Sequence, residues 1–114
     1  MAGLVVLNGP TIAAGESLSD GLDCSGGPIV KVTMPASWDA ANITFQTSTD
    51  GLFYNDMFDT EGHEVSFKVY AGTAIWVDRM RMGWLKFRSG TRDNPVPQKE
   101  QRAFAVAIDT IAVG

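Results

Sequence analysis

The chain has 114 residues, of which 45% are hydrophobic and 19% are charged, and its formal net charge is -4. This length supports one hydrophobic core, and the composition is that of a globular rather than a disordered chain. The acidic balance argues against nonspecific duplex binding, which depends on neutralising phosphates, and no apolar run approaches the roughly 20 residues that span a bilayer. We therefore expect a single domain over residues 1–114 with no nucleic-acid or membrane partner.

Apolar segments lie at both ends of the chain, MAGLVVLNGP at the start and IDTIAVG at the end. The first lacks the basic region and the long apolar stretch of a signal peptide, so we expect a protein that is made and assembled in a cytosol. Chain ends fray unless something holds them. These apolar terminal arms are expected either to complete the domain's own sheet or to lie on a neighbouring subunit. We favour the first, because a free apolar edge would be sticky.

Apolar and polar residues alternate with a period of two along most of the chain, which predicts strands with one buried face. Turn signals such as Asp50-Gly51 and Ser89-Gly90 separate these runs at short spacing. The predicted strands are 4–7, 11–14, 17–23, 29–34, 43–48, 52–57, 64–70, 74–78, 84–89 and 102–109. A short helical turn is expected over 35–41, and a polar loop over 90–101 is expected to project. The predicted fold is an all-β antiparallel sandwich or jelly roll of about eight to ten short strands.

The chain has one cysteine, Cys24, and one histidine, His63. A single cysteine excludes an internal disulfide and a cysteine metal cluster, and Cys24 is expected to be a buried strand residue. His63 lies in EGHE between acidic neighbours, which is typical of a solvated turn. A small hydrolase would depend on His63 or Asp56, and neither a P-loop nor a GxGxxG run is present. We expect no enzymatic activity and no cofactor.

Acidic side chains gather between residues 50 and 64, and the candidate ligands are Asp50, Asp56, Asp59 and Glu61. Carboxylate oxygens are the ligands that calcium prefers. The spacing is not that of an EF-hand loop. A solvated loop face is the favoured interpretation, and these four residues are the alternative calcium candidates.

Charge is unevenly distributed along the chain. Residues 1–64 contain nine of the thirteen acidic groups and one basic group, whereas residues 65–114 contain eight of the nine basic groups. The two halves therefore carry -8 and +4. A two-signed surface suits head-to-tail or ring contacts between copies. Alternatively, the strands interleave in space and the charges mix.

Aromatic and basic residues supply two further sets of candidates. Trp38, Phe53 and Tyr54 could form a stacking platform for a sugar. Trp76 and Trp84 lie off the main apolar phase, as expected of tryptophans at an interface. Because basic residues are enriched over 76–92, the predicted partner-contact residues are Trp76, Arg79, Arg81, Trp84, Arg88 and Arg92.

The segment PASWDAANITFQTSTDG, the turn GHEV, the run WLKFRSGT and the late strand RAFAVAI together resemble small virion proteins of tailed bacteriophages and gene transfer agents. The resemblance covers roughly residues 15–109. It implies a β-sandwich present in many copies on a particle assembled in a bacterial cytoplasm. The implied role is capsid decoration or cement, a spike base, or a head–tail or tail accessory, with the major capsid protein and copies of itself as partners.

A second resemblance concerns the pair ITFQTSTDG and LKFRSGT, which is similar to discoidin-type carbohydrate-binding sandwiches. It implies an alternative function, a carbohydrate-binding module of a tail or host-adsorption device. Neither resemblance carries a motif that assigns a role to a particular residue.

Overall fold

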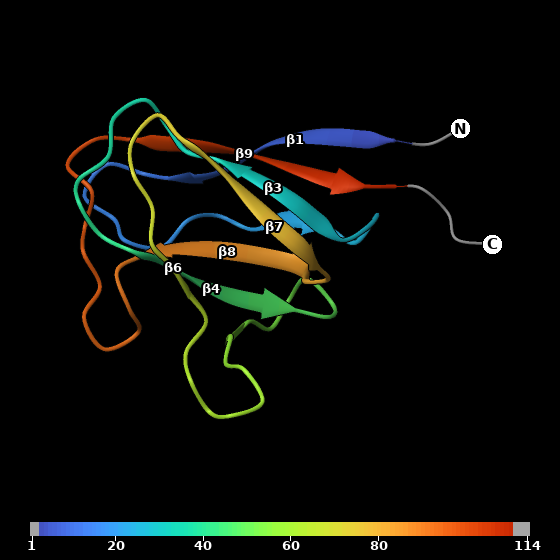
Figure 1. Ribbon diagram of the computed structural model, residues 1–114. Helices are drawn as coiled ribbons and strands as arrows, with labels where there is room; N and C mark the ends of the chain where they lie inside the picture. The colour runs from blue at the N-terminus through green and yellow to red at the C-terminus, as the bar shows by residue number, and fades with distance from the viewer. Residues whose placement is uncertain (1–2, 111–114) are drawn as a thin grey trace.

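The structure is a computed structural model that describes residues 3–110, and over that range the chain forms nine strands and no helix (Figure 1). The strands are β1 (Leu4–Ile12), β2 (Leu22–Cys24), β3 (Ile29–Thr33), β4 (Ile43–Ser48), β5 (Asn55–Asp56), β6 (Ser66–Phe67), β7 (Ala74–Met80), β8 (Gly83–Ser89) and β9 (Arg102–Asp109). This confirms the predicted all-β class.

The strands form two antiparallel sheets that pack face to face (Figure 1). The first sheet has the order β1-β9-β3-β7. The second has the order β2-β8-β4-β5, and β6 also pairs with β4. Although β7 and β8 are neighbours in sequence, they belong to different sheets, so the short connection between them crosses from one layer to the other.

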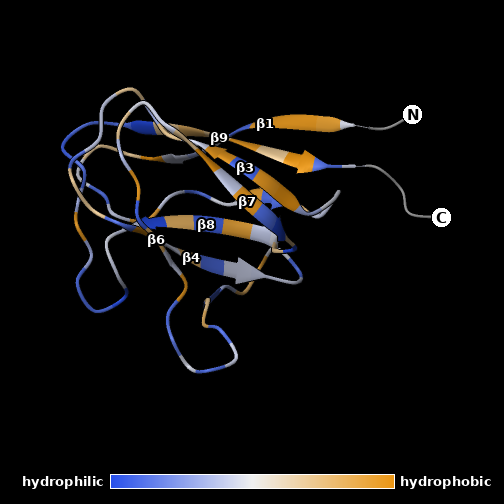
Figure 2. Ribbon diagram, in the orientation of Figure 1, coloured by the Kyte–Doolittle hydropathy of each residue, from blue (hydrophilic) through white to orange (hydrophobic). Residues whose placement is uncertain are grey.

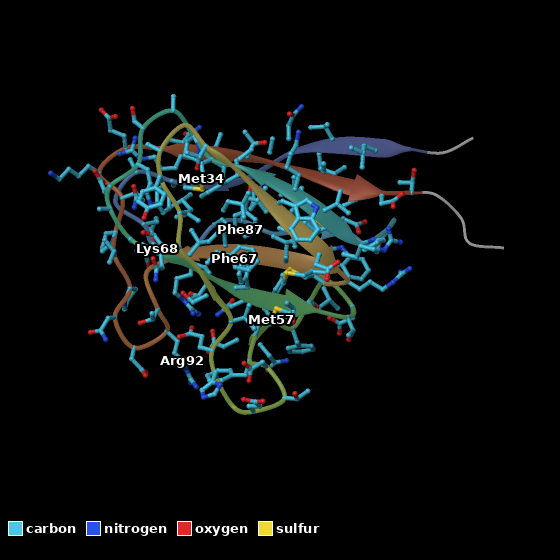
Figure 3. All side chains as sticks on the ribbon, in the orientation of Figure 1. Met34, Met57, Phe67, Lys68, Phe87 and Arg92 are labelled. Carbon is cyan, nitrogen blue, oxygen red and sulfur yellow. The ribbon has the colours of Figure 1, made fainter. Side chains whose placement is uncertain are left out.

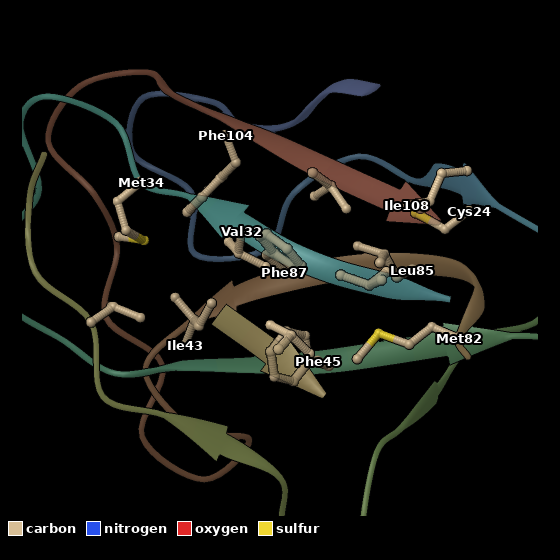
Figure 4. Close-up of a cluster of buried hydrophobic side chains, with 14 of the residues drawn as sticks. Cys24, Val32, Met34, Ile43, Phe45, Met82, Leu85, Phe87, Phe104 and Ile108 are labelled. Carbon is tan, nitrogen blue, oxygen red and sulfur yellow. The ribbon is translucent and has the colours of Figure 1, made fainter. Parts of the chain in front are cut away.

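Alternation places one face of each long strand in a shared core, which Figure 4 shows in close-up. Phe45 and Phe87 of the second sheet meet edge to face at 5.4 Å between ring centroids, and Phe87 meets Phe104 of the first sheet at 4.9 Å. Aromatic pairs prefer this geometry. Ile43 is also fully buried, as its inward position in the alternating run predicts. The sandwich is therefore held by apolar contacts between the layers.

Several predicted elements differ from the observed ones. The predicted strands 4–7 and 11–14 are one strand, and 17–23, 52–57 and 64–70 shorten to two or three paired residues each. At the start of the predicted strand 52–57, Asp50 Oδ1 accepts the backbone N–H groups of Leu52 (2.8 Å) and Phe53 (3.1 Å). These hydrogen bonds turn the chain instead of extending it. The predicted helical turn over 35–41 is irregular, and the backbone N–H of Asp39 bonds to the distant Gln98 Oε1 (2.9 Å).

The loop over 90–101 projects only in its first half. Residues 92–95 are exposed, but Gln98 is completely buried. Its amide donates to Asp39 O (3.0 Å) and Ser89 Oγ (2.8 Å), and it accepts from Arg102 Nε (3.0 Å). A buried amide with these partners fastens the loop to the sandwich.

The terminal arms complete the first sheet as far as they are described. β1 pairs with β9 from Leu4–Asp109 to Ile12–Arg102, and Thr110 N donates to Gly3 O (3.1 Å). Residues 1–2 and 111–114 lie outside the described residues. The two paired strands extend together past the end of the second sheet (Figure 1), and β1 is hydrophobic along this projecting part (Figure 2).

Candidate functional site

The six predicted contact residues do not form one patch. Trp76 lies on the outer face of β7, in the first sheet, and 78% of its surface is exposed. Trp84 lies half-buried on the outer face of β8, in the second sheet, below the turn at Gly51. The two tryptophans therefore face away from each other across the sandwich.

Arg79 and Arg81 lie at the connection between the two sheets. Arg79 has a φ of 50°, and its guanidinium binds the carboxylate of Asp109 at 2.5 Å. Arg81 is exposed and lines a shallow hollow of about 270 Å³ together with Trp84, Ser25 and Thr49. Arg79 is thus occupied in holding the end of β9, whereas Arg81 remains at the surface.

Arg88 is buried and has intramolecular partners. Its guanidinium binds Asp56 and lies 3.2 Å from Glu64 Oε2, and it also bonds to Thr44 Oγ1 (3.3 Å). The hydrogen bond from Arg88 is the main cause that holds the pKa of Asp56 below its usual range. We therefore assign Arg88 to the fold rather than to an interface.

Arg92 is half-exposed where the loop after β8 meets the loop between β5 and β6 (Figure 3). Its Nε lies 3.3 Å from Asp56 Oδ2, and its guanidinium lies over the ring of Phe58 at 5.6 Å. Together with Arg88 it ties an acidic segment of the first half of the chain to a basic segment of the second. The charges of the two halves thus mix here, as the interleaved alternative predicts.

The three sugar candidates do not form a common platform. Trp38 Nε1 donates to Ala41 O (3.0 Å), and its ring meets the edge of Phe104 in the core, so Trp38 covers the end of the sandwich. Tyr54 lies across the second sheet, where Lys86 Nζ is 4.5 Å from its ring centroid. Phe53 is 77% exposed at a loop tip.

The candidate calcium ligands are dispersed. Asp50 and Asp59 accept backbone N–H groups of their own turns, which lowers the pKa of each carboxyl. Asp56 is paired with arginine, and Glu61 is exposed. Within residues 3–110 no three histidine, cysteine or acidic side chains are grouped as metal ligands.

The single imidazole and the single thiol occupy the expected environments. His63 is exposed on its turn, and its Nδ1 lies 3.5 Å from Asp59 Oδ2. Cys24 is buried in β2, and burial raises the pKa of its thiol to about 12. Neither group has the surroundings of an activated nucleophile or base.

Two surfaces of the first sheet were predicted only in part, the N-terminal arm as completing the sheet or lying on a neighbouring subunit and Trp76 as a contact residue. The β1 edge, Leu4–Asn8, exposes 64% of Leu4 and 60% of Val6, and its only sequence signal is an uncharged apolar run. The β7 groove is a hollow of about 370 Å³ between β6 and β7, lined mainly by Phe67, Ile75, Trp76, Val77 and Met80. Such uncovered apolar surface marks interaction sites.

Comparison of the chain with protein-family models, with curated proteins and with solved structures finds no match. Over the part of the chain that the structure describes, no helix has the length and apolarity to cross a membrane.

Proposed function

We propose that this protein is a structural subunit of a tailed-phage or phage-like particle, without enzymatic activity, and that it decorates or cements the capsid or forms a spike base. It is held by many protein–protein contacts, to the major capsid protein and to copies of itself. The proposal rests on the resemblance of the sequence to small virion proteins and on one structural observation, the uncovered apolar surface of the first sheet.

Four large hydrophobic side chains are exposed on strands of the first sheet, and four others, Leu52, Phe53, Phe58 and Tyr70, are exposed outside the strands. β1 presents Leu4, Val5 and Val6, and β7 presents Trp76, all of them exposed. Large apolar side chains grouped on an isolated subunit are typical of a surface that a partner covers. Particle proteins meet this condition because symmetry repeats each contact in every copy.

The charged groups support a structural rather than a catalytic role. The most buried cations, Arg88 and Arg102, both bind carboxylates of their own chain. The carboxylates of Asp56 and Glu64 converge on Arg88, so they are held as its counter-ions and not as an acid–base pair across a cleft.

The test is the composition of purified particles. Particles banded in a density gradient are expected to contain this chain in a fixed ratio to the major capsid protein, measured by quantitative mass spectrometry. Charge reversal at Arg81, Arg81→Glu, is expected to reduce the ratio if that exposed cation contacts the shell, and Lys99→Glu is the matched control on an exposed loop. A chain found only in the soluble fraction would refute the proposal.

The second candidate function is carbohydrate binding, and the hollow beside Trp84 is the observation that favours it. An aromatic ring, the Arg81 guanidinium and the hydroxyl-bearing Ser25 and Thr49 line it. Sugars stack on aromatic rings and bond to such polar groups. This function predicts saturable quenching of tryptophan fluorescence by a glycan, lost in Trp84→Ala and kept in Trp76→Ala. Equal quenching in both variants would exclude this site.

A further inference from the structure

Within residues 3–110 the first sheet ends in two edges, β1 and β7, and no described strand pairs with their outer sides. We propose that copies of this protein associate head to tail, with the β1 edge of one copy added to the free edge of β7 in the next copy. The inference rests on the proposed structural function and identifies a second copy of the chain as one of its partners.

The β1 edge is open over a defined length. At its far end, Thr11 N donates to Asp20 Oδ1 (2.8 Å) and Asp20 N donates to Thr11 O (3.1 Å), so that part of the edge is already covered. Among residues 3–110 no strand pairs with the outer side of Leu4–Asn8. This stretch has no charge and no proline, the devices that usually protect an edge from pairing.

The pairing pattern shows which backbone groups of β1 point outward. Thr110 N donates to Gly3 O (3.1 Å), and bonded and non-bonded pairs alternate along an antiparallel ladder. The N–H and C=O groups that point away from β9 are therefore those of Leu4, Val6 and Asn8. These are also the residues whose side chains lie on the outer face of the sheet, opposite to Leu7.

The same reasoning applies to the other edge. Met34 N donates to Thr73 O (2.8 Å), which directs the backbone groups of Ala74 and Trp76 away from β3. Their side chains also lie on the outer face. After Trp76 the register between β3 and β7 shifts, and pairing resumes at Ile29 and Met80. Arg79, with its φ of 50°, lies in this irregular stretch, so the regular edge ends at Trp76.

The two edges match in direction. Each strand of β1-β9-β3-β7 is antiparallel to its neighbour, so β1 and β7 run in opposite directions. A second copy placed beside the first therefore presents β1 antiparallel to β7, as pairing requires. A register that places Val6 opposite Trp76 also places Asn8 opposite Ala74, so two outward positions of β1 meet the two outward positions of the regular β7 edge.

The side chains match as well. Within one copy Val6, Ala107, Lys31 and Trp76 lie in register across the sheet, so Val6 of a second copy would continue this outer row beside the exposed Trp76 ring. Cross-strand contact between an aromatic and a β-branched side chain stabilises sheets.

The opposite face of the added strand would fill the β7 groove. Leu7 lies in register with Val106 and Val32, and through them with Ile75, so its side chain is on the groove side of the sheet. Phe67 of β6 and Lys68, which follows β6, also line the groove. An apolar strand is thus a suitable occupant of an apolar groove.

Two-fold pairing of β1 with β1 would satisfy one edge only. It would leave Trp76 and the β7 groove uncovered. Head-to-tail pairing uses both edges and the groove. Because the two surfaces differ, the contact repeats from copy to copy and closes into a ring or continues as a filament.

The test uses two variants that each block one edge. Val6→Lys places a charge on the β1 edge, and Trp76→Lys places one on the β7 edge, both at exposed positions. Light scattering coupled to size exclusion is expected to give an oligomer for the wild type and for the control Ala14→Lys, and the mass of the 12.3 kDa chain for each blocked variant. Mixing the two blocked variants is expected to give twice that mass and nothing larger, since each retains the edge that the other lacks.

Other outcomes overturn the inference. A monomeric wild type at every concentration refutes association. A Trp76→Lys variant that remains dimeric shows two-fold pairing through β1, and a mixture that stays monomeric shows that the edges do not bind each other. Circular dichroism and the melting temperature establish that each variant is folded. Leu4→Lys and Ala74→Lys, at exposed positions of the same edges, replace any variant that does not fold.

Particle analysis separates this inference from the proposed function. A protein that is incorporated into particles but shows no edge pairing refutes the head-to-tail contact alone. A protein that pairs through its edges in solution but is absent from particles refutes the virion role alone.

Discussion

Arg88 lies on the outer face of β8 but is buried there. Among residues on the outer face of the second sheet, replacing Arg88 by alanine is expected to be the most destabilising substitution. The guanidinium lies under the segment between β5 and β6 and binds both Asp56 and Glu64. The side chain of Arg88 is 9% exposed, and those of Asp56 and Glu64 are 21% and 16% exposed. Removing the cation takes from Glu64 the guanidinium that it binds and leaves Asp56 paired with the half-exposed Arg92.

Breaking a buried ion pair by removing one partner costs about 3–5 kcal/mol, and the residual exposure of both carboxylates favours the lower end. We expect Arg88→Ala to lower the free energy of unfolding by about 3 kcal/mol near neutral pH. For a domain of this size each kcal/mol corresponds to about 4 °C, so the melting temperature is expected to fall by about 12 °C. Urea unfolding monitored by tryptophan fluorescence measures the free energy directly.

The loss is expected to depend on pH with a defined sign. The pKa of Asp56 is lowered in the folded protein, chiefly by the hydrogen bond from Arg88. A group with a depressed folded pKa stabilises the fold fully above its unfolded pKa of about 3.9, and this contribution disappears as pH falls through the folded value. The difference between wild type and Arg88→Ala is therefore expected to be constant from about pH 5 to 7 and to narrow below about pH 4.

Arg92→Ala is the matched control, because Arg92 also contacts Asp56 but its side chain is 49% exposed. Exposed ion pairs contribute about 1 kcal/mol or less. If Arg88→Ala were no more destabilising than Arg92→Ala, or if its effect persisted unchanged at pH 3, the reasoning from burial and charge would be refuted.

Three further predictions concern buried groups and a constrained turn. Gln98→Leu is expected to lose about 2–3 kcal/mol in urea unfolding, because it leaves the buried partners of the amide unsatisfied; an unchanged midpoint would contradict this. Cys24, whose thiol pKa is raised to about 12, is expected to react with Ellman's reagent at pH 8 only as fast as the protein unfolds, and rapid labelling of the native protein would contradict its burial. Gly83→Ala is expected to lower the free energy of unfolding by more than about 1 kcal/mol, because a Cβ at Gly83 would lie 2.7 Å from Ser48 O at a φ of 67°. Gly62→Ala is the control, because nothing lies within 4 Å of a Cβ there. Equal losses in the two variants would indicate that the positive φ matters and the contact with Ser48 does not.

The sequence correctly predicted which face of a strand a side chain occupies, because this depends only on the alternation within that strand. Alternation placed Ile43, Phe45, Phe87 and Phe104 inside, and all four are buried. The same alternation directed Arg88 to the outer face of β8, which is its actual face. It could not show that a segment more than twenty residues away folds over that face and buries the guanidinium.

The candidate interface could be predicted only in part, for a similar reason. Trp76 was expected at the surface from its phase, and it is exposed. The apolar run at Leu4–Asn8 was noted, but a run of this kind suits a central strand as well as an edge. Whether it is covered depends on strand order, which hydrogen bonds between distant segments determine.

By itself the sequence determined the period-two pattern, the turns and therefore the all-β class with one apolar core. These follow from local preferences, because side chains alternate along any strand. Only the tertiary structure decided which strands became edges, which charges were buried and where apolar surface stayed open. Those features depend on contacts between residues far apart in the chain, and pairing order cannot be read from the composition of any single strand.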